Sequence, residues 1–234
     1  MTGTRTKTVL AIGGHIGDMD LTAGPLLAEH VLQGHRGVLL ALTPGERGHP
    51  RLSPEEYKLQ KIAEGAEFAK DIGAEFRCFD DLSDGFLGTG DDVALRIADV
   101  IREVRPDVVI AHWRHSIHSD HAHAAQLTER ARFLAGLPLE RERPRHGVPT
   151  VLHAENWEDM EGFTPDRYAP VCTEAFDRWH AAISKQAFAR GETYGFRYID
   201  YYTALLTMRG CLSGRERASA LSSGNGAKTV GPLW

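Results

Sequence analysis

Short apolar runs alternate with longer segments of helical periodicity along most of the chain. The apolar runs, each typical of a strand buried on both faces, lie at 8–14, 37–42, 75–79, 107–111 and 150–154. The helical patterns lie at 21–32, 54–72, 91–105, from about 121 onward, and at 174–190 and 198–209. This alternation predicts an α/β fold with a doubly wound, Rossmann-like three-layer architecture and a mostly parallel central sheet.

The start of one helix is marked by its residues. Ser53 offers an N-cap, Pro54 stands at the first helical position, and Glu56 at the third completes a capping box. No linker or internal repeat divides the chain, so we expect one domain over residues 1–221. The segment 222–234 is rich in small residues and lacks periodicity, which predicts a flexible C-terminal tail.

Composition and charge narrow the classes of protein that fit. Hydrophobic residues make up 42% and charged residues 25% of the 234 residues, as in ordinary globular domains. The net charge of -5 and the lack of a basic run argue against a nucleic-acid partner. The first apolar run is too short for an export signal or a membrane span. Three scattered cysteines indicate no disulfide framework, so we expect a cytoplasmic protein without a membrane partner.

Two clusters of metal-binding residue types follow predicted strands. The first is His-Ile-Gly-Asp-Met-Asp at 15–20, and the second is His-Ser-Asp-His at 118–121. In a parallel sheet both would lie at the carboxyl edge, where ligands bind. Neutral imidazole and carboxylate suit zinc, and a catalytic zinc site has about three protein ligands. We therefore predict a metal site at His15, Asp18 and His121, with another divalent ion as the alternative to zinc.

The same residues resemble the motifs of the LmbE-like (PIG-L) zinc-dependent N-deacetylases. That family opens with a strand and His-Pro-Asp-Asp-x-Glu and later carries His-x-Asp-His. Further similar positions are Gly34-His35, the loop 43–48, Glu64, Ile72-Gly73, Asp84-Gly85, Lys185-Gln186 and Arg209-Gly210. The likeness spans about residues 7–221.

The resemblance implies roles for three residues of the second cluster. His121 would hold zinc together with His15 and Asp18. His118 would polarise the amide carbonyl or stabilise the oxyanion. Asp120 would orient a histidine.

Two further residues are predicted to bind substrate. Arg47 lies in the loop 43–48 after a predicted strand, and Asp84 lies in a later strand-end loop. A carboxylate such as Asp84 accepts hydrogen bonds from sugar hydroxyls. Of the other histidines near the second cluster, His112, His115 and His123 are expected at the surface or beside the ligands.

The first cluster departs from the family pattern where a proton acceptor is expected. Gly17 stands in place of the water-activating aspartate, Ile16 replaces proline and Asp20 replaces glutamate. General-base assistance is typically worth ~10²–10⁴-fold, so its loss would be serious without abolishing zinc-hydroxide chemistry. Asp20, Glu46 and His115 are the substitutes that the sequence offers.

The predicted function is a zinc-dependent hydrolase that removes an N-acyl group, first of all N-acetyl, from an amino sugar or a glycosylated small metabolite. The alternative is a degenerate member that binds a small molecule without hydrolysis, and Gly17→Asp would distinguish the two. A dehydrogenase fits less well because Gly13-Gly14 is not G-x-G-x-x-G. The partner is thus an N-acetylated small molecule, and a homo-oligomer is compatible with the resemblance.

Overall fold

The central element is a single twisted sheet. The computed structural model describes residues 5–223 and 229–233. The strands follow the order β3-β2-β1-β4-β5-β7-β6-β8. Their bounds are β1 Thr8–His15, β2 Arg36–Thr43, β3 Glu75–Cys78, β4 Val108–Ala111, β5 Thr150–Ala154, β6 Arg167–Pro170, β7 Ala218–Ser222 and β8 Thr229–Val230. Pairing is parallel from β3 through to β5 and antiparallel where β7 joins β5 and β6. The predicted α/β fold with a mostly parallel sheet is confirmed.

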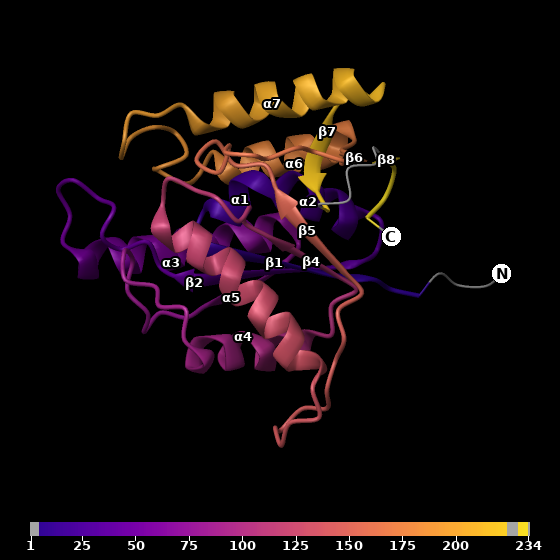
Figure 1. Cartoon of the computed structure of the whole chain (residues 1–234). Helices are drawn as coiled ribbons and strands as arrows, with labels where there is room; N and C mark the ends of the chain where they lie inside the picture. Colours follow the sequence, from indigo (N-terminus) through magenta and orange to yellow (C-terminus); the bar gives the residue numbers. More distant parts are fainter. Residues whose placement is uncertain (1–4, 224–228, 234) are drawn as a thin grey trace.

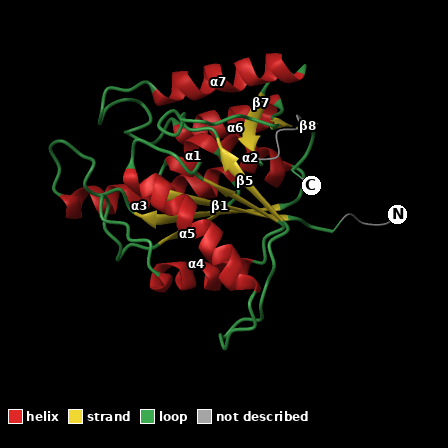
Figure 2. Ribbon diagram, in the orientation of Figure 1, coloured by secondary structure: helices red, strands yellow, loops and turns green. Residues whose placement is uncertain are grey.

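Helices cover both faces of this sheet. Their bounds are α1 Asp18–Thr22, α2 Gly24–Leu32, α3 Pro54–Ile72, α4 Asp91–Val104, α5 Ser119–Gly136, α6 Thr173–Ile183 and α7 Tyr198–Ser213. Figures 1 and 2 show α4 and α5 on one side of the sheet, α1, α2 and α6 on the other, and α7 outermost. The three-layer prediction therefore holds.

The side chains of β1 explain why both faces are covered. Val9 and Ala11 point into the core that includes α2, α3 and α6, whereas Leu10 and Ile12 point into the core that includes α4 and α5. All four are completely buried. Since fully burying an aliphatic side chain of this size contributes roughly 1.5–3 kcal/mol, both layers of helices stabilise the strand that leads to the first cluster.

The predicted capping box at the start of α3 is confirmed. The Glu56 amide donates to Ser53 Oγ at 3.3 Å, and the Ser53 amide donates to a Glu56 carboxylate oxygen at 3.0 Å. Within the described residues, no helix is long and apolar enough to cross a membrane.

The C-terminal third differs from the sequence prediction. The helix expected over 174–190 ends at Ile183, because the following amides of Lys185 and Gln186 bond to carbonyls only three residues back. The strands β6, β7 and β8 were not predicted. In the segment expected to be a tail, Ser222 ends β7 and β8 pairs with β6, so the described part of it is not a free tail. Residues 224–228 and 234 lie outside the described part of the chain.

Candidate metal centre and cavity

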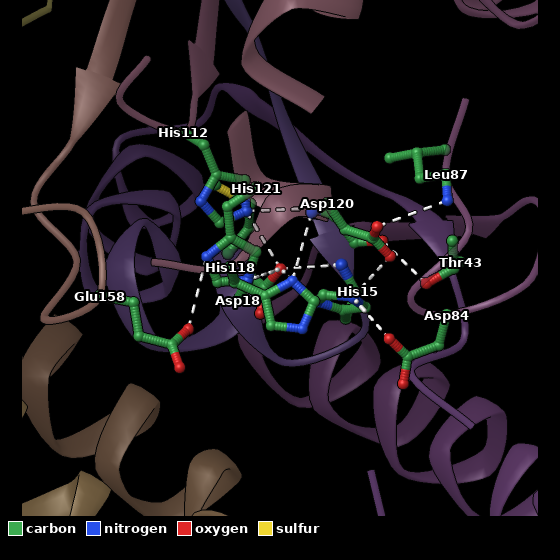
Figure 3. A network of polar contacts seen from close by, with 12 residues as sticks. His15, Asp18, Thr43, Asp84, Leu87, His112, His118, Asp120, His121 and Glu158 are labelled. Atoms are coloured by element: carbon green, nitrogen blue, oxygen red, sulfur yellow. Dashed lines mark hydrogen bonds and ion pairs between the residues drawn. The ribbon is translucent and has the colours of Figure 1, made fainter. Parts of the chain in front are cut away.

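The fold brings the two predicted clusters together. His15 ends β1 and Asp18 begins α1, while His118 is the N-cap of α5 and His121 lies in its first turn. Because β4, which leads to α5, pairs directly with β1, the two clusters meet at the carboxyl edge of the sheet. From β1 the next strands along the chain, β2 and β3, lie on one side and β4 and β5 lie on the other. Ligands of doubly wound folds bind at such a switch point. Figure 3 shows the resulting group of side chains.

A tight turn at Gly17 carries the chain from His15 to Asp18. Gly17 has a φ of 108°, a conformation that glycine adopts without steric cost. The turn lets Asp18 Oδ2 accept a hydrogen bond from the His15 amide at 2.7 Å. The carboxylate is thereby fixed over the end of β1.

Asp18 lies at the spacing of metal ligands from each of the two predicted histidine ligands. Asp18 Oδ2 lies 3.3 Å from His15 Nδ1 and 3.4 Å from His121 Nε2. Two ligands at ~2.0–2.1 Å from a tetrahedral ion are about 3.3 Å apart, so both separations match a zinc site. Overlapping sets of candidate ligands are formed by His15, His118 and His121 and by Asp18, His112 and His121. Each of these sets combines nitrogen or oxygen donors of the kinds that divalent ions take.

The second nitrogen of each predicted histidine ligand faces a carboxylate. His121 Nδ1 is 3.2 Å from Asp159 Oδ1. His15 Nε2 is 3.1 Å from Asp84 Oδ1 and 3.3 Å from Asp120 Oδ2. Protons on these outer nitrogens would leave the inner nitrogens, which face Asp18, with free lone pairs. This is the usual arrangement around histidines that bind metals.

The electrostatics of the cluster favour a cation. Burial lowers the pKa of His121, but the charge of Asp18 and the hydrogen bond to Asp159 outweigh it and raise that pKa to about 9. The pKa of His15 is likewise raised against burial, chiefly by the charge of Asp18. Conversely the pKa of Asp18 is lowered against burial by the two histidines. A negative field that holds extra protons on histidines also attracts a metal ion.

His112 lies beside the ligands, as predicted, and is completely buried. Its Nε2 accepts a hydrogen bond from the Gly14 amide at 3.1 Å, so its Nδ1 carries the proton that goes to Asp159 Oδ2 at 2.8 Å. Its Nε2 is also 3.0 Å from Asp18 Oδ2. Because Nε2 already accepts from Gly14, we assign His112 to positioning Asp159 rather than to the metal.

His118 and Asp120 lie beside the predicted metal ligands. The Asp120 amide donates to His118 Nδ1 at 3.3 Å, so in the neutral imidazole Nε2 carries the hydrogen. Burial and the neighbouring His15 and His121 lower the pKa of His118, which keeps the ring neutral at pH 7. Asp120 Oδ2 accepts from the Gly85 amide at 2.7 Å and faces His15. Of the histidines in this group, Asp120 thus contacts His15.

The two predicted substrate-binding residues differ in position. Asp84 lines the cavity beside the cluster and contacts His15. Arg47 is not among the residues that line it: its guanidinium Nε donates to Ser83 Oγ at 2.9 Å and half of its side chain is exposed. Its backbone amide donates to Asp84 Oδ2 at 3.1 Å, so Arg47 helps to hold the Asp84 loop.

None of the three substitute bases from the sequence lines the cavity. The Asp20 carboxylate is not part of the cavity lining and accepts from Gln186 Nε2 at 2.7 Å. Glu46 accepts from Ser83 and from the Asp84 amide and so stabilises their loop. His115 is exposed.

The cavity contains functional groups that the sequence analysis did not identify. It has a volume of about 430 Å³. Residues that line it beyond the predicted site include Lys61, Asn156, Trp157, Glu158, Phe188, Tyr194, Phe196, Tyr198 and Tyr202. Glu158 Oε2 is 3.4 Å from His121 Nδ1, and burial raises the pKa of its carboxyl. Glu158 and Asp159 follow β5 at the same sheet edge, so the strand-end rule used for the two clusters could have found them.

The space beside Gly17 is already filled. An ideal Cβ at Gly17 would lie 2.8 Å from Phe188 Cε1, closer still to Phe188 Cζ, and 3.1 Å from Lys61 Nζ. Phe188 is itself buried. The pocket is thus built around glycine and leaves no room for a carboxylate at this position.

Two relatives and one solved structure resemble this chain over different lengths. The 4-oxalmesaconate hydratase of Pseudomonas putida KT2440 is 28% identical over 91% of this chain and 83% of that protein. A 1D-myo-inositol 2-acetamido-2-deoxy-alpha-D-glucopyranoside deacetylase of Thermomonospora curvata is 25% identical over 58% of this chain and 56% of that protein. The crystal structure of the 4-carboxy-2-hydroxymuconate hydratase GalB from P. putida KT2440 superposes with a TM-score of 0.84 and 25% identity, over 93% of this chain and 95% of that one.

The family model described as PIG-L, GlcNAc-PI de-N-acetylase, matches residues 10–132, more than half of the chain. This stretch contains both clusters and the strands that bring them together. The resemblance read from the motifs is therefore confirmed, and the chain belongs to the PIG-L family.

Proposed function

We propose that this protein is a metal-dependent hydratase, which adds water to a carbon–carbon double bond of a small carboxylic acid. His15, Asp18 and His121 are the metal ligands in this proposal, and zinc is the ion that their nitrogen and oxygen donors suit best. Such an ion, when bound, lowers the pKa of a coordinated water toward ~7 and polarises an oxygen of the substrate.

The observation that carries the proposal is the packing around Gly17. N-Deacetylases of the family, by the resemblance described above, take a proton from water with an aspartate at this position. Here the ring of Phe188 and the ammonium of Lys61 occupy its space. The protein therefore has to accept the proton elsewhere, which supports a reaction other than the family's usual one.

Glu158 is the proton acceptor that we propose in its place. It lines the cavity, contacts His121, and has a pKa raised by burial, which brings a carboxylate closer to the range of an efficient general base. In the hydration, the water oxygen bonds to one carbon as the carbon–carbon π bond breaks, and the water proton passes to Glu158. The other carbon takes a proton from solvent, to which Glu158 releases the proton that it accepted. The neutral His118 ring donates from Nε2 to the oxygen on which negative charge develops.

The named hydratases support this choice of reaction. The chain and the hydratase of P. putida match over most of both lengths, whereas the match to the named deacetylase covers little more than half of either protein. Carrying the hydratase activity over to this chain is our inference.

Removal of an N-acetyl group from an amino sugar or a glycosylated metabolite is the second candidate. It is favoured by the family model, and by the Nε2 hydrogen of His118, which could equally stabilise the oxyanion of a tetrahedral intermediate. Glu158 would then have to serve the deacetylation as base.

The test is a direct comparison of both reactions with zinc-reconstituted protein. Hydration of 4-oxalmesaconate is followed by the loss of the absorbance of its conjugated system, and deacetylation of N-acetylglucosamine by release of acetate. Hydration that disappears in both His121→Ala and Glu158→Gln is the expected result. Acetate release without hydration would establish the second candidate, and zinc binding with neither activity would leave a non-catalytic binding protein.

A further inference from the structure

Lys61 is a cation buried in the wall of the cavity. It lies in α3, is only 4% exposed and lines the cavity. Its Nζ lies 3.9 Å from the centroid of the Phe188 ring. It faces the space beside Gly17, where a missing Cβ would lie 3.1 Å from the ammonium. The charge is therefore next to the turn that carries Asp18.

Within the described residues no carboxylate forms a close ion pair with this ammonium, although the charges of Asp20, Asp18, Glu64 and Asp84 act on it from farther away. No carboxylate there comes within 4.0 Å of Nζ, and its close contact is the face of Phe188. Asp20, whose charge acts on it most, has an oxygen engaged by Gln186. Burial lowers the pKa of Lys61 although the charges of Asp20 and Asp18 raise it. By contrast, the exposed Lys185 lies 2.8 Å from carboxylates of both Glu67 and Asp71.

A buried charge without an ion-pair partner costs free energy, and a ligand of opposite charge that binds beside it offsets that cost. We propose that the Lys61 ammonium binds a carboxylate group of the substrate, so that this residue selects acids over neutral molecules. This proposal rests on the proposed function, because it places the carboxylate in the cavity of the candidate metal centre. Glycine at position 17 is then a second part of the same device, since any side chain there would approach the ammonium too closely.

A single ammonium beside aromatic rings suits a carboxylate better than a phosphate. The monoanion balances the one positive charge, and the faces of Phe188 and Tyr198 can pack against an unsaturated carbon chain. Phosphate sites usually gather several backbone amides or arginines. A neutral N-acetyl sugar offers no charge to this group.

The experiment measures binding of mesaconate, an unsaturated dicarboxylate, by isothermal titration calorimetry. Wild type, Lys61→Met and Lys70→Met are compared with and without zinc. Lys70 is the matched control because it is an exposed lysine of the same helix. We expect Lys61→Met to bind mesaconate at least 10-fold more weakly, Lys70→Met to bind as wild type does, and dimethyl mesaconate to bind to none of them.

Thermal melting without ligand gives an independent readout. Loss of an unpartnered buried charge should leave the Tm of Lys61→Met at or above that of wild type. If Lys61→Met does not fold, acetylation of the wild type by acetic anhydride replaces it: mesaconate should protect Lys61, and not Lys70, from modification. The proposal would be overturned by equal affinity in wild type and Lys61→Met, by absence of mesaconate binding to wild type, or by absence of protection. Lys61-dependent binding that is tighter for inorganic phosphate than for mesaconate would also overturn it.

The outcomes separate this proposal from the proposed function. Lys61-dependent mesaconate binding by a chain that holds no zinc and hydrates nothing would keep the carboxylate site and overturn the hydratase. Hydration with an unchanged KM in Lys61→Met would keep the hydratase and overturn the carboxylate site at Lys61.

Discussion

The ring of Phe188 occupies the space into which a side chain at position 17 would project. A Cβ added to Gly17 would lie 2.8 Å from Phe188 Cε1, and the φ of 108° disfavours every residue with a Cβ. The glycine is therefore required by the packing of this pocket, and restoring the family's aspartate should harm the protein.

Gly17→Asp should destabilise the fold by about 2–5 kcal/mol, from the combined costs of backbone strain and overpacking. It should create no deacetylase activity. Chemical denaturation measures the effect, with Gly34→Asp as control, since Gly34 also has a positive φ but nothing within 4 Å of its Cβ position. Partial recovery of stability in Gly17→Asp with Phe188→Ala would locate the clash, whereas a stable and newly active Gly17→Asp would refute this view of the pocket.

Zinc should bind at about one ion per chain and be lost in His121→Ala, because that change removes one of three ligands. Elemental analysis after chelation and reloading measures this. His115→Ala is the control, because His115 is exposed and does not line the cavity. Full zinc content in His121→Ala would rule out the assigned ligand set.

Glu158→Gln should lower kcat by ~10²–10⁴-fold while the zinc content stays unchanged, because the amide cannot accept a proton from water. Steady-state kinetics of the hydration of 4-oxalmesaconate measure the effect. Glu161→Gln, an exposed glutamate of the same loop, should behave as wild type. An unchanged kcat in Glu158→Gln would assign the base to another group.

Asp159→Asn should weaken zinc binding about 10–100-fold, although Asp159 is not itself one of the assigned ligands. Asp159 is completely buried and holds the outer nitrogens of His112 and His121, which keep its own pKa well below the usual range. Competition with a chromogenic chelator gives the affinity, and the exposed Asp177→Asn serves as control. Equal zinc affinity in both variants would contradict the orienting role.

Lowering the pH should decrease the free energy of unfolding, because the buried His30 resists protonation in the folded chain. Burial, and next the neighbouring His35, lower its pKa to about 4 from the usual 6.5. Between these values the unfolded chain takes up a proton that the folded chain refuses, so stability is lost as the pH falls from about 6.5 toward 4. From pH 7 to pH 5 the loss should be on the order of 1–2 kcal/mol. His30→Gln should remove that part of the pH dependence of the unfolding free energy, and His115→Gln should keep it.

The sequence predicted those parts of the fold that local patterns determine. The helix α3 was predicted correctly because its capping box and its periodicity lie within the segment itself. The strands β6 and β8 escaped notice because they carry no continuous apolar run, and their pairing depends on distant partners.

The candidate site shows the same division. The meeting of His15 with His121 followed from strand ends, which a motif can mark. The positions of Lys61 and Phe188 beside Gly17 could not be predicted in this way. A buried lysine of a helix and a phenylalanine after Ile183 carry no local signal for a shared pocket. Glu158 was overlooked although it follows a correctly predicted strand.

The walls of the cavity come from two parts of the chain, one inside and one outside the stretch that the family model matches. The predicted metal ligands lie within residues 10–132, the stretch that the family model matches, whereas the aromatic wall from Trp157 to Tyr202 lies beyond it. Exchange of the aromatic residues of this wall can change which molecules the cavity accepts, provided that Glu158 and Asp159, which contact His121, are kept. Ion binding and the choice of substrate can then change independently of each other.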